Sequence, residues 1–379
     1  MFKISKIDAF GVGLPLKAPI KMSSVVIHIA ENIIVRIEDS DGTIGWGEAT
    51  EAPTMTGESV PGMLAAVKFL TPLLTGREIE DLPHIHAVMD DLMYGNHGAK
   101  SAIEIALLDL SGKRLGKPLY EILGGKVRDE APILVMLAGG DKDAEVANAK
   151  QQADQGFVAF KVKIGALGPS QDLDRSRAAR DVLGNSARIS ADANQGYSRD
   201  EALMFSEGAA DAGLDFMEQL VDYRDLDGMA ACAQASKVPL GADEGFHAMS
   251  DILAHKDRGA AHGGSLKTIK LGGAFPVMEA GRVMDTMSMH VNLAGKVADS
   301  SIASAAIAHL ALCLPQVNWD TSITNQYLAE DLVDDPIKII DGVVRAPSAF
   351  SITRGSDPSI TATQEFVVPK SIPITFAII

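Results

Sequence analysis

Cysteine is scarce in this sequence: Cys232 and Cys313 are the only two among 379 residues. They form no CxxC pair and no disulfide framework, so we expect the reducing environment of the cytoplasm. Nine histidines are scattered without HExxH or a similar spacing, which argues against a zinc site. No run of about 18 apolar residues occurs, and the first residues lack the apolar segment of a signal peptide. The sequence therefore predicts a cytoplasmic protein with no membrane partner.

Basic residues are also in deficit. The 34 lysines and arginines are outnumbered by 50 aspartates and glutamates, for a formal net charge of −16. This charge argues against nucleic acid as a partner, and a bound divalent cation would neutralise part of it. The hydrophobic fraction of 46% and the charged fraction of 22% are ordinary for a soluble globular protein. Because the chain is too long for one compact core, we expect two domains or a barrel with an added domain.

The first part of the chain, residues 1–127, has the pattern of an α+β domain. Strand-like runs and the turn Asp39–Gly42 come first, and three segments with helical spacing follow. The predicted strands are Ile4–Val12, Asn32–Glu38 and Thr43–Glu48, and the predicted helices are Met63–Leu74, Pro83–Leu92 and Ala99–Leu115. Two loops, Pro15–His28 and Thr50–Gly57, have no regular pattern and are candidates for covering a site.

From residue 128 to 340, short apolar runs alternate with amphipathic helices. Eight such runs predict a closed (β/α)8 barrel behind an N-terminal α+β capping domain. The runs are Pro132–Ala138, Phe157–Lys163, Arg188–Asp192, Leu214–Glu218, Val238–Asp243, Ser265–Ile269, His290–Ala294 and Val317–Asp320. Residues 341–379 are irregular and rich in proline, and we expect them to pack back on the capping domain.

Charged residues recur at the carboxyl end of consecutive runs. Lys161 and Lys163 end the second run, and two residues that are two apart in a strand point to the same face. Asp192, Glu218, Asp243 and Lys267 follow at intervals of 29, 26, 25 and 24 residues, counted from Lys163. Each interval is about one βα unit, so every one of these residues returns to the same end of the barrel, where barrel enzymes place their chemistry.

Three carboxylates that gather at one end need a cation to offset their mutual repulsion. Oxygen ligands without cysteine or histidine favour Mg²⁺, with Mn²⁺ as the second choice, over Zn²⁺. A cation flanked by two lysines suits removal of a proton beside a carboxylate, because the cation stabilises the enediolate that forms. A neighbouring ammonium group lowers the pKa of a lysine, so Lys161 is expected to tune Lys163 as a base.

Sequence motifs identify a family at this point. KVK, DAN, MEQ, ADE and SLKxxKxGG, in this order, strongly resemble the muconate-lactonizing subgroup of the enolase superfamily, whose sites use a lysine or histidine base with Mg²⁺. DGTIGWGEA and SAIEIALLDLSGKRLGKPLYEILGG resemble the capping domain of that family. The resemblance implies that Asp192, Glu218 and Asp243 bind the metal ion.

The same resemblance implies roles for the remaining residues. Lys163 and Lys267 become the acid–base pair, Lys161 assists them, and Asn194 contacts the substrate carboxylate or supports a residue that does. The partner is a small-molecule carboxylate, and related proteins assemble as homo-oligomers, commonly dimers or octamers.

Three further residues are predicted to contact the substrate. Lys296 follows the seventh run, where we expect a small or apolar residue, and is a candidate for binding a substrate anion. Trp319 and Asp320 end the eighth run; Trp319 would form an apolar wall or a cation–π contact, although a core role is the ordinary one for tryptophan. Asp320 loosely matches the glutamate of muconate cycloisomerases.

Each of these residues also has an ordinary interpretation. A lone Lys-x-Lys is usually solvated, and an aspartate after a strand is often a helix N-cap. The charged residues recur at the ends of four consecutive βα units, and this recurrence favours the catalytic interpretation. Lys270 is expected to be a loop charge, and Glu244 to point away from Asp243 along an extended strand. His290 lies at the start of the seventh run, which disfavours the mandelate-racemase subgroup.

We therefore predict an enzyme that resembles muconate cycloisomerase. The alternatives are racemisation or epimerisation of an N-acylamino acid, a dipeptide or a related compound, and dehydration of the kind that succinylbenzoate synthases catalyse. A non-catalytic barrel that binds a ligand is the third class, and it predicts tolerance of Lys163→Ala.

Overall fold

The computed structural model describes residues 2–21, 26–79 and 81–346. The chain begins with an antiparallel sheet of β1 (Ile4–Lys21), β2 (Val26–Asp39) and β3 (Ile44–Thr50), in the order β1-β2-β3. The helices α1 (Val60–Leu74), α2 (Leu82–Leu92), α3 (His97–Leu115) and the short α4 (Leu119–Ile122) follow. The predicted α+β pattern is confirmed for these elements, and β1 runs nine residues beyond its predicted end.

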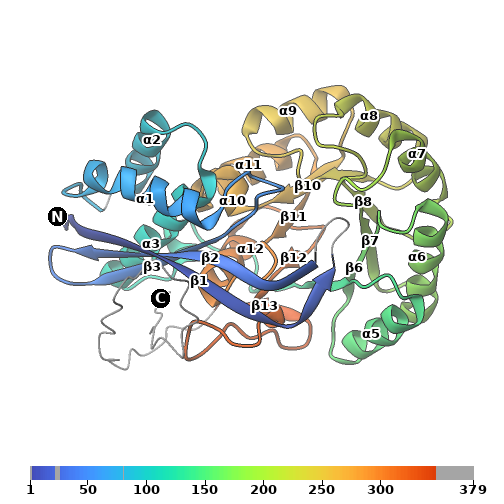
Figure 1. The fold of residues 1–379 in the computed structure, drawn as a ribbon, viewed down its shortest axis with the longest axis horizontal. Coiled ribbons are helices and arrows are strands. Elements are labelled where there is room, and N and C mark those ends of the chain that lie inside the picture. Colours follow the sequence, from blue (N-terminus) through green and yellow to red (C-terminus); the bar gives the residue numbers. More distant parts are fainter. Residues whose placement is uncertain (1, 22–25, 80, 347–379) are drawn as a thin grey trace.

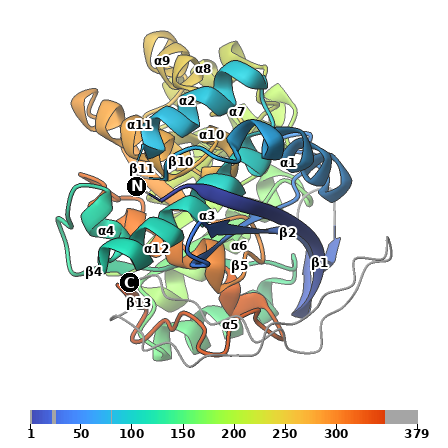
Figure 2. The same cartoon turned by 90° about the vertical axis from the view of Figure 1, so that its left-hand side faces the viewer.

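Two glycines let α3 lie directly on the sheet. A Cβ atom at Gly45 would stand 2.1 Å from the carbonyl oxygen of Ala106, and one at Gly47 would stand 1.9 Å from that of Ala102. No side chain fits these distances, so the GWG sequence of β3 is required by the close approach of the helix backbone. In Figures 1 and 2, α3 lies against this sheet, and it also contacts α10 and α11 of the second domain.

The second domain is a parallel barrel. Its strands are β5 (Leu134–Leu137), β6 (Ala159–Lys163), β7 (Arg188–Asp192), β8 (Phe216–Glu218), β9 (Leu240–Ala242), β10 (Gly263–Leu266), β11 (His290–Ala294) and β12 (Thr321–Ser322). They pair in chain order, and a parallel bridge between Ile133 and Thr321 joins the first strand to the last. The predicted (β/α)8 barrel with an N-terminal capping domain is confirmed.

Helices surround the barrel on its outside. They are α5 (Lys142–Asp154), α6 (Pro169–Leu183), α7 (Arg199–Gly208), α8 (Leu226–Ala235), α9 (Met249–Arg258), α10 (Thr268–Leu271), α11 (Ala274–Thr286) and α12 (Ser301–Cys313). In Figure 1, α5 to α9 form an arc on the side away from the β1–β3 sheet. No helix among the described residues is both long and apolar enough to span a lipid bilayer.

Two short elements complete the described chain. A 3-10 turn covers Asn325–Tyr327, and β13 (Val343–Arg345) pairs antiparallel with β4 (Glu130–Pro132) at the start of the barrel domain. The segment predicted to pack on the capping domain can be followed only to residue 346, since residues 347–379 lie outside the described residues.

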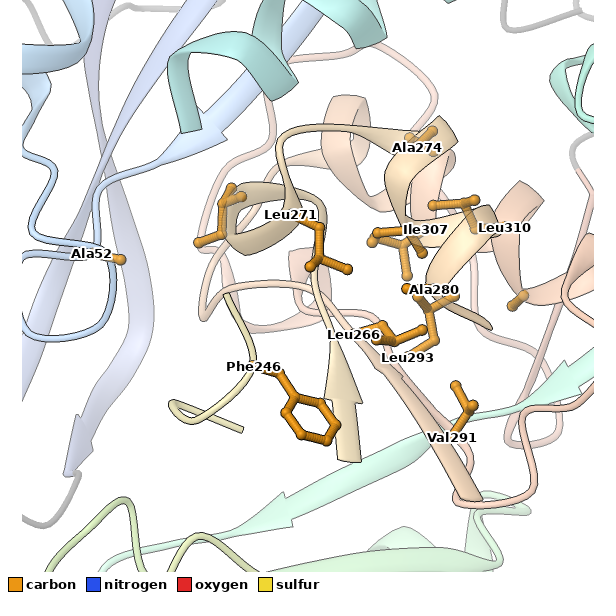
Figure 3. Packing of buried hydrophobic residues seen from close by; sticks show 14 of the residues in the cluster. Ala52, Phe246, Leu266, Leu271, Ala274, Ala280, Val291, Leu293, Ile307 and Leu310 are labelled. Atoms are coloured by element: carbon orange, nitrogen blue, oxygen red, sulfur yellow. The ribbon is translucent and has the colours of Figure 1, made fainter. Parts of the chain in front are cut away.

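Alternation along β11 separates the core from the barrel interior. Val291 and Leu293 are fully buried, and Figure 3 shows them on the side of Ala280 of α11 and Leu310 of α12. Asn292 points the other way: its Oδ1 accepts from the hydroxyl of Ser265, which also donates to Glu218 inside the barrel. Apolar residues therefore hold the helices on, and polar residues face inward.

One strand prediction was wrong. The eighth strand is Thr321–Ser322, whereas Val317–Asp320 was predicted. The apolar residues of that run precede the strand instead of forming it, so the residues at its carboxyl end are Ser322 to Thr324.

Candidate active site

Lys161 and Lys163 both reach into the barrel from β6, as their spacing predicted. Lys161 Nζ contacts the carboxylate of Glu218, and Lys163 Nζ lies 2.5 Å from Oδ2 of Asp192. Burial alone lowers the pKa of Lys161, but the negative charges of Glu218 and Asp192 outweigh it and raise that pKa. Lys161 Nζ also lies 3.9 Å from Oδ2 of Asp192, so the two ammonium groups share this carboxylate while Glu218 pairs with Lys161.

The three predicted metal ligands stand at the carboxyl ends of β7, β8 and β9. Asp192 and Glu218 are direct partners in the β7–β8 register, and Asp243 comes one residue after β9. Each of the three is at most 2% exposed. Burial raises the pKa of Glu218, whereas for Asp192 the ammonium groups of Lys163 and Lys161 outweigh burial and lower it.

Two lysines bind Asp243, one directly after β10 and one in α10. Lys267 Nζ contacts Oδ2, and Lys270 Nζ lies 2.6 Å from Oδ1 and also contacts the main-chain oxygen of Asp243. Lys270 is fully buried, so its predicted role as a loop charge was wrong. The reason is α10: it begins at Thr268 and winds Lys270 back under the carboxylate.

Lys163 and Lys267 stand on opposite sides of the barrel. Their strands, β6 and β10, are four apart in an eight-stranded order. A cavity of about 60 Å³ lies between them. Its lining comprises Met55, Leu134, Met136, Lys161, Lys163, Asp192, Asn194, Asp243, Lys267, Ala294, Gly295, Lys296, Val297, Ser322, Ile323, Thr324 and Tyr327.

Asn194 links the first lysine to a fourth carboxylate. Its Oδ1 accepts a hydrogen bond from Lys163 Nζ at 2.9 Å, and its Nδ2 donates to Oε1 of Glu244 at 3.1 Å. Burial, and then the charge of Asp243, raise the pKa of Glu244 to about 7. The prediction that Glu244 points away was wrong, because β9 ends at Ala242 and strand alternation does not extend to this residue.

Gln219 was missed by the sequence analysis. Its Oε1 accepts from the main-chain nitrogens of Asp243 at 2.9 Å and Gly245 at 3.0 Å, and its Nε2 donates to the oxygen of Val221. It thereby joins the loop after β8 to the loop after β9. Its place in the MEQ motif, directly after Glu218, was the available signal.

The capping domain reaches the site through Met55. The sulfur of Met55 lies 3.9 Å from Lys267 Nζ. The main-chain oxygen of Met55 is 2.7 Å from Nε2 of His247, in the loop after β9. Burial lowers the pKa of His247, so the imidazole is neutral at pH 7 and donates this hydrogen bond. The predicted loop Thr50–Gly57 thus covers Lys267.

A second contact between the domains is polar and buried. Glu48 of β3 accepts hydrogen bonds from the main-chain nitrogens of Ser300 and Ala303, both at 2.9 Å, at the start of α12. Burial, and then the charge of Asp299, raise the pKa of Glu48 to about 7. Asp299 in turn accepts from the hydroxyl of Thr50 at 2.6 Å.

Trp319 and Asp320 lie at the other end of the barrel, so their predicted contact with the substrate does not hold. Trp319 stacks on Phe216 and His290, the first residues of β8 and β11. Asp320 pairs at 2.6 Å with Arg188, the first residue of β7. The misplaced eighth strand is the cause, since both residues precede β12 and do not end it. Lys296, by contrast, lines the cavity.

Asp192, Glu218 and Asp243 have the right donor atoms for a divalent cation, but they do not converge on one point. All are oxygen donors on neighbouring strand ends, as a hard divalent cation requires. In the described part of the chain, however, no three histidine, cysteine, aspartate or glutamate side chains converge on one point. The ammonium groups of Lys161, Lys163 and Lys267 hold them apart. Asp192, Glu218 and Asp243 would hold a divalent cation only if they turned from the lysines toward one another.

Comparisons with known proteins agree with this geometry. Residues 6–124 match the model of the mandelate racemase / muconate lactonizing enzyme N-terminal domain, and residues 144–350 match the enolase C-terminal domain-like model. The chain is 32% identical to muconate cycloisomerase 1 of Pseudomonas putida, covering 91% of this chain and 93% of that protein. It is 31% identical to an N-succinyl-L-Arg/Lys racemase of Bacillus cereus, covering 82% and 84%.

Solved structures give the same picture. The muconate lactonizing enzyme from Pseudomonas fluorescens, in complex with muconolactone, superposes with a TM-score of 0.87 at 30% identity, covering 90% of this chain and 94% of that one. The L-Ala-D/L-Glu epimerase from Bacillus subtilis superposes with a TM-score of 0.86 at 27% identity, covering 91% and 96%.

Proposed function

Because the chain belongs to the mandelate racemase and muconate lactonizing enzyme family of the enolase superfamily, we propose that it catalyses Mg²⁺-dependent proton transfer at the carbon beside a substrate carboxylate. One observation carries the proposal: Lys163 and Lys267 come from strands four apart, with the carboxylates of Asp192, Glu218 and Asp243 at the strand ends between them.

The residues of this chain supply the proton transfer. A neutral amine of Lys163 or Lys267 takes the proton from the α-carbon, and the C–H electron pair passes into the carboxylate to give an enediolate. The cation, held by Asp192, Glu218 and Asp243, would supply positive charge that offsets the charge growing on the carboxylate oxygens. Asp243, Glu218 and Glu244 raise the pKa of Lys267 against the effect of burial. Release from Asp243 therefore lowers this pKa, so a larger fraction of Lys267 is the neutral amine that can take the proton.

The leading reaction is cycloisomerisation of a muconate-type dicarboxylate. One carboxylate of the diene forms a C–O bond to its own chain, which leaves an enolate beside the other carboxylate. A lysine ammonium group then gives its proton to that carbon. The likeness to muconate cycloisomerase 1 over 91% of the chain supports this reaction.

The second candidate is racemisation of an N-acylamino acid. It is favoured by two lysines on opposite sides of one cavity, which suits removal of a proton from one face and its return to the other. The likeness to the Bacillus cereus racemase supports it as well.

Proton NMR in D₂O tests the proposal. The protein is incubated with Mg²⁺ and a panel of muconates, succinylbenzoate precursors, N-acylamino acids and dipeptides. Exchange of an α-hydrogen that stops when EDTA is added supports the proposal. A panel in which no acid exchanges or isomerises with Mg²⁺ present would contradict it and favour a ligand-binding barrel.

A further inference from the structure

Lys296 is the lysine of the cavity whose ammonium group has no acidic partner. Lys161, Lys163, Lys267 and Lys270 each lie within 4.0 Å of a carboxylate. Among residues 2–21, 26–79 and 81–346, Lys296 has no such ion pair, although its side chain is partly buried. A buried cation normally has a paired anion, so this one calls for an explanation.

The nearest acid is engaged elsewhere. Asp299 Oδ2 accepts a hydrogen bond from the main-chain nitrogen of Lys296 at 2.8 Å, and Oδ1 accepts from the hydroxyl of Thr50. The hydroxyl of Thr324 donates to the main-chain oxygen of Lys296 at 2.5 Å. The backbone of Lys296 is therefore fixed from both sides, while its side chain extends into the cavity.

Neighbouring charges make this position unfavourable for an ammonium group. Burial, and then the ammonium group of Lys267, lower the pKa of Lys296 to about 8, so it still carries a charge at pH 7. Lys161, Lys163 and Lys267 line the same cavity, and each of them has a carboxylate partner. The ammonium group of Lys296 is therefore the cavity charge that remains for an anionic ligand.

A monocarboxylate substrate leaves the ammonium group of Lys296 without an anion. Its single carboxylate is the group beside the reacting carbon, at the three acids between Lys163 and Lys267. Lys296 forms no ion pair with these acids and follows β11, whereas Ser322 ends the paired strand β12 and lines the same cavity. An ammonium and a hydroxyl group together suit a carboxylate.

We propose that Lys296 binds a second carboxylate of the substrate, the one that is not enolised, and so selects dicarboxylates over monocarboxylates. The inference rests on the proposed function for the position of the first carboxylate. It assigns to this side chain the recognition of the far end of the substrate.

Calorimetric binding with Mg²⁺ present tests the proposal through two probes that differ by one carboxylate, adipate and hexanoate. The wild-type protein is expected to bind adipate at least tenfold more tightly than hexanoate; glutarate and pimelate then define the preferred spacing. Lys296→Met should bring the ratio of the two dissociation constants close to one, and Lys296→Arg should retain most of the preference. Lys142→Met is the matched control, because Lys142 is exposed on α5 and pairs with Asp174; it should keep the wild-type ratio.

Two results would overturn the inference. One is a wild-type protein that binds adipate and hexanoate equally, or that does not bind adipate at millimolar concentration. The other is an unchanged ratio in a folded Lys296→Met protein. The outcome is separable from that of the proposed function. Adipate binding that depends on Lys296, without any deuterium exchange, would contradict the proposed function alone. Deuterium exchange together with an unchanged ratio of the adipate and hexanoate dissociation constants would contradict this inference alone.

Discussion

Lys270 binds both the carboxylate and the main-chain oxygen of Asp243, from a position with no exposure to solvent. The pair holds the loop after β9 against α10, and Asp243 is the residue on which two lysines and a predicted metal ion converge.

Lys270→Met should destabilise the protein. Asp243 keeps Lys267 as a partner, but the buried main-chain oxygens of Asp243 and Ser265 lose the donor Lys270, at a typical cost of about 1–3 kcal/mol each. Urea denaturation gives the free energy of unfolding directly. Lys68→Met, at an exposed position of α1, is the control and should change it by less than about 0.5 kcal/mol. Equal stability of the two variants would show that Lys270 contributes no more than a surface charge.

Stability should fall as the pH rises, through Glu48. Its pKa of about 7 in the folded protein exceeds the ordinary 4.5, so the folded state keeps a proton that the unfolded state releases. This stabilisation is complete below pH 4.5. It is lost as the pH rises to about 7, by roughly 1.4 kcal/mol for each pH unit.

Glu48→Gln should therefore weaken the dependence of the free energy of unfolding on pH. The free energy of unfolding is measured by urea denaturation at pH 4.5 and at pH 8. Its decrease between these two pH values should be roughly 2–3 kcal/mol smaller in the variant than in the wild type. Glu121→Gln, on the surface, is the control. A variant whose pH profile matches that of the wild type would rule out Glu48 as the source.

Substitution of His247 should loosen the loop over Lys267. His247→Phe removes the hydrogen bond to the main-chain oxygen of Met55, and one hydrogen bond contributes about 1 kcal/mol. We expect KM to rise about fivefold with a smaller change in kcat, and faster proteolysis within residues 53–57. His84→Phe, at an exposed position of α2, should have neither effect. If KM and proteolysis both stay at wild-type values, the loop is held by other contacts.

Metal binding should compete with the lysines. Calorimetry should show Mg²⁺ binding by the wild type and none, or at least about tenfold weaker binding, by Asp192→Asn, which loses a charged ligand. Lys163→Met should bind Mg²⁺ more tightly than the wild type, because it frees Asp192 from its ammonium partner. Identical affinities in all three proteins would place the cation elsewhere.

Much of the site was predictable because it follows strand ends. Lys163, Asp192 and Glu218 each end an apolar run that forms a strand with that same last residue. Errors arose where the chain leaves regular structure. α10 turns Lys270 inward, β9 stops before Glu244, and the run before Asp320 precedes its strand. Glu48 and Ser300 are 252 residues apart, and no local pattern signals a contact of that range.

Deuterium incorporation by two lysine variants tests the central claim most directly. With Mg²⁺ in D₂O, and with each enantiomer or reaction direction of the substrate followed separately by proton NMR, Lys163→Ala and Lys267→Ala are compared with the wild type. We predict a loss of about 10²–10⁴-fold for each variant in at least one direction, and opposite enantiomers for the two variants if the reaction is a racemisation. The control Lys142→Ala should exchange at the wild-type rate. If both Lys163→Ala and Lys267→Ala fold and exchange as fast as the wild type, neither lysine transfers the proton and the account is wrong.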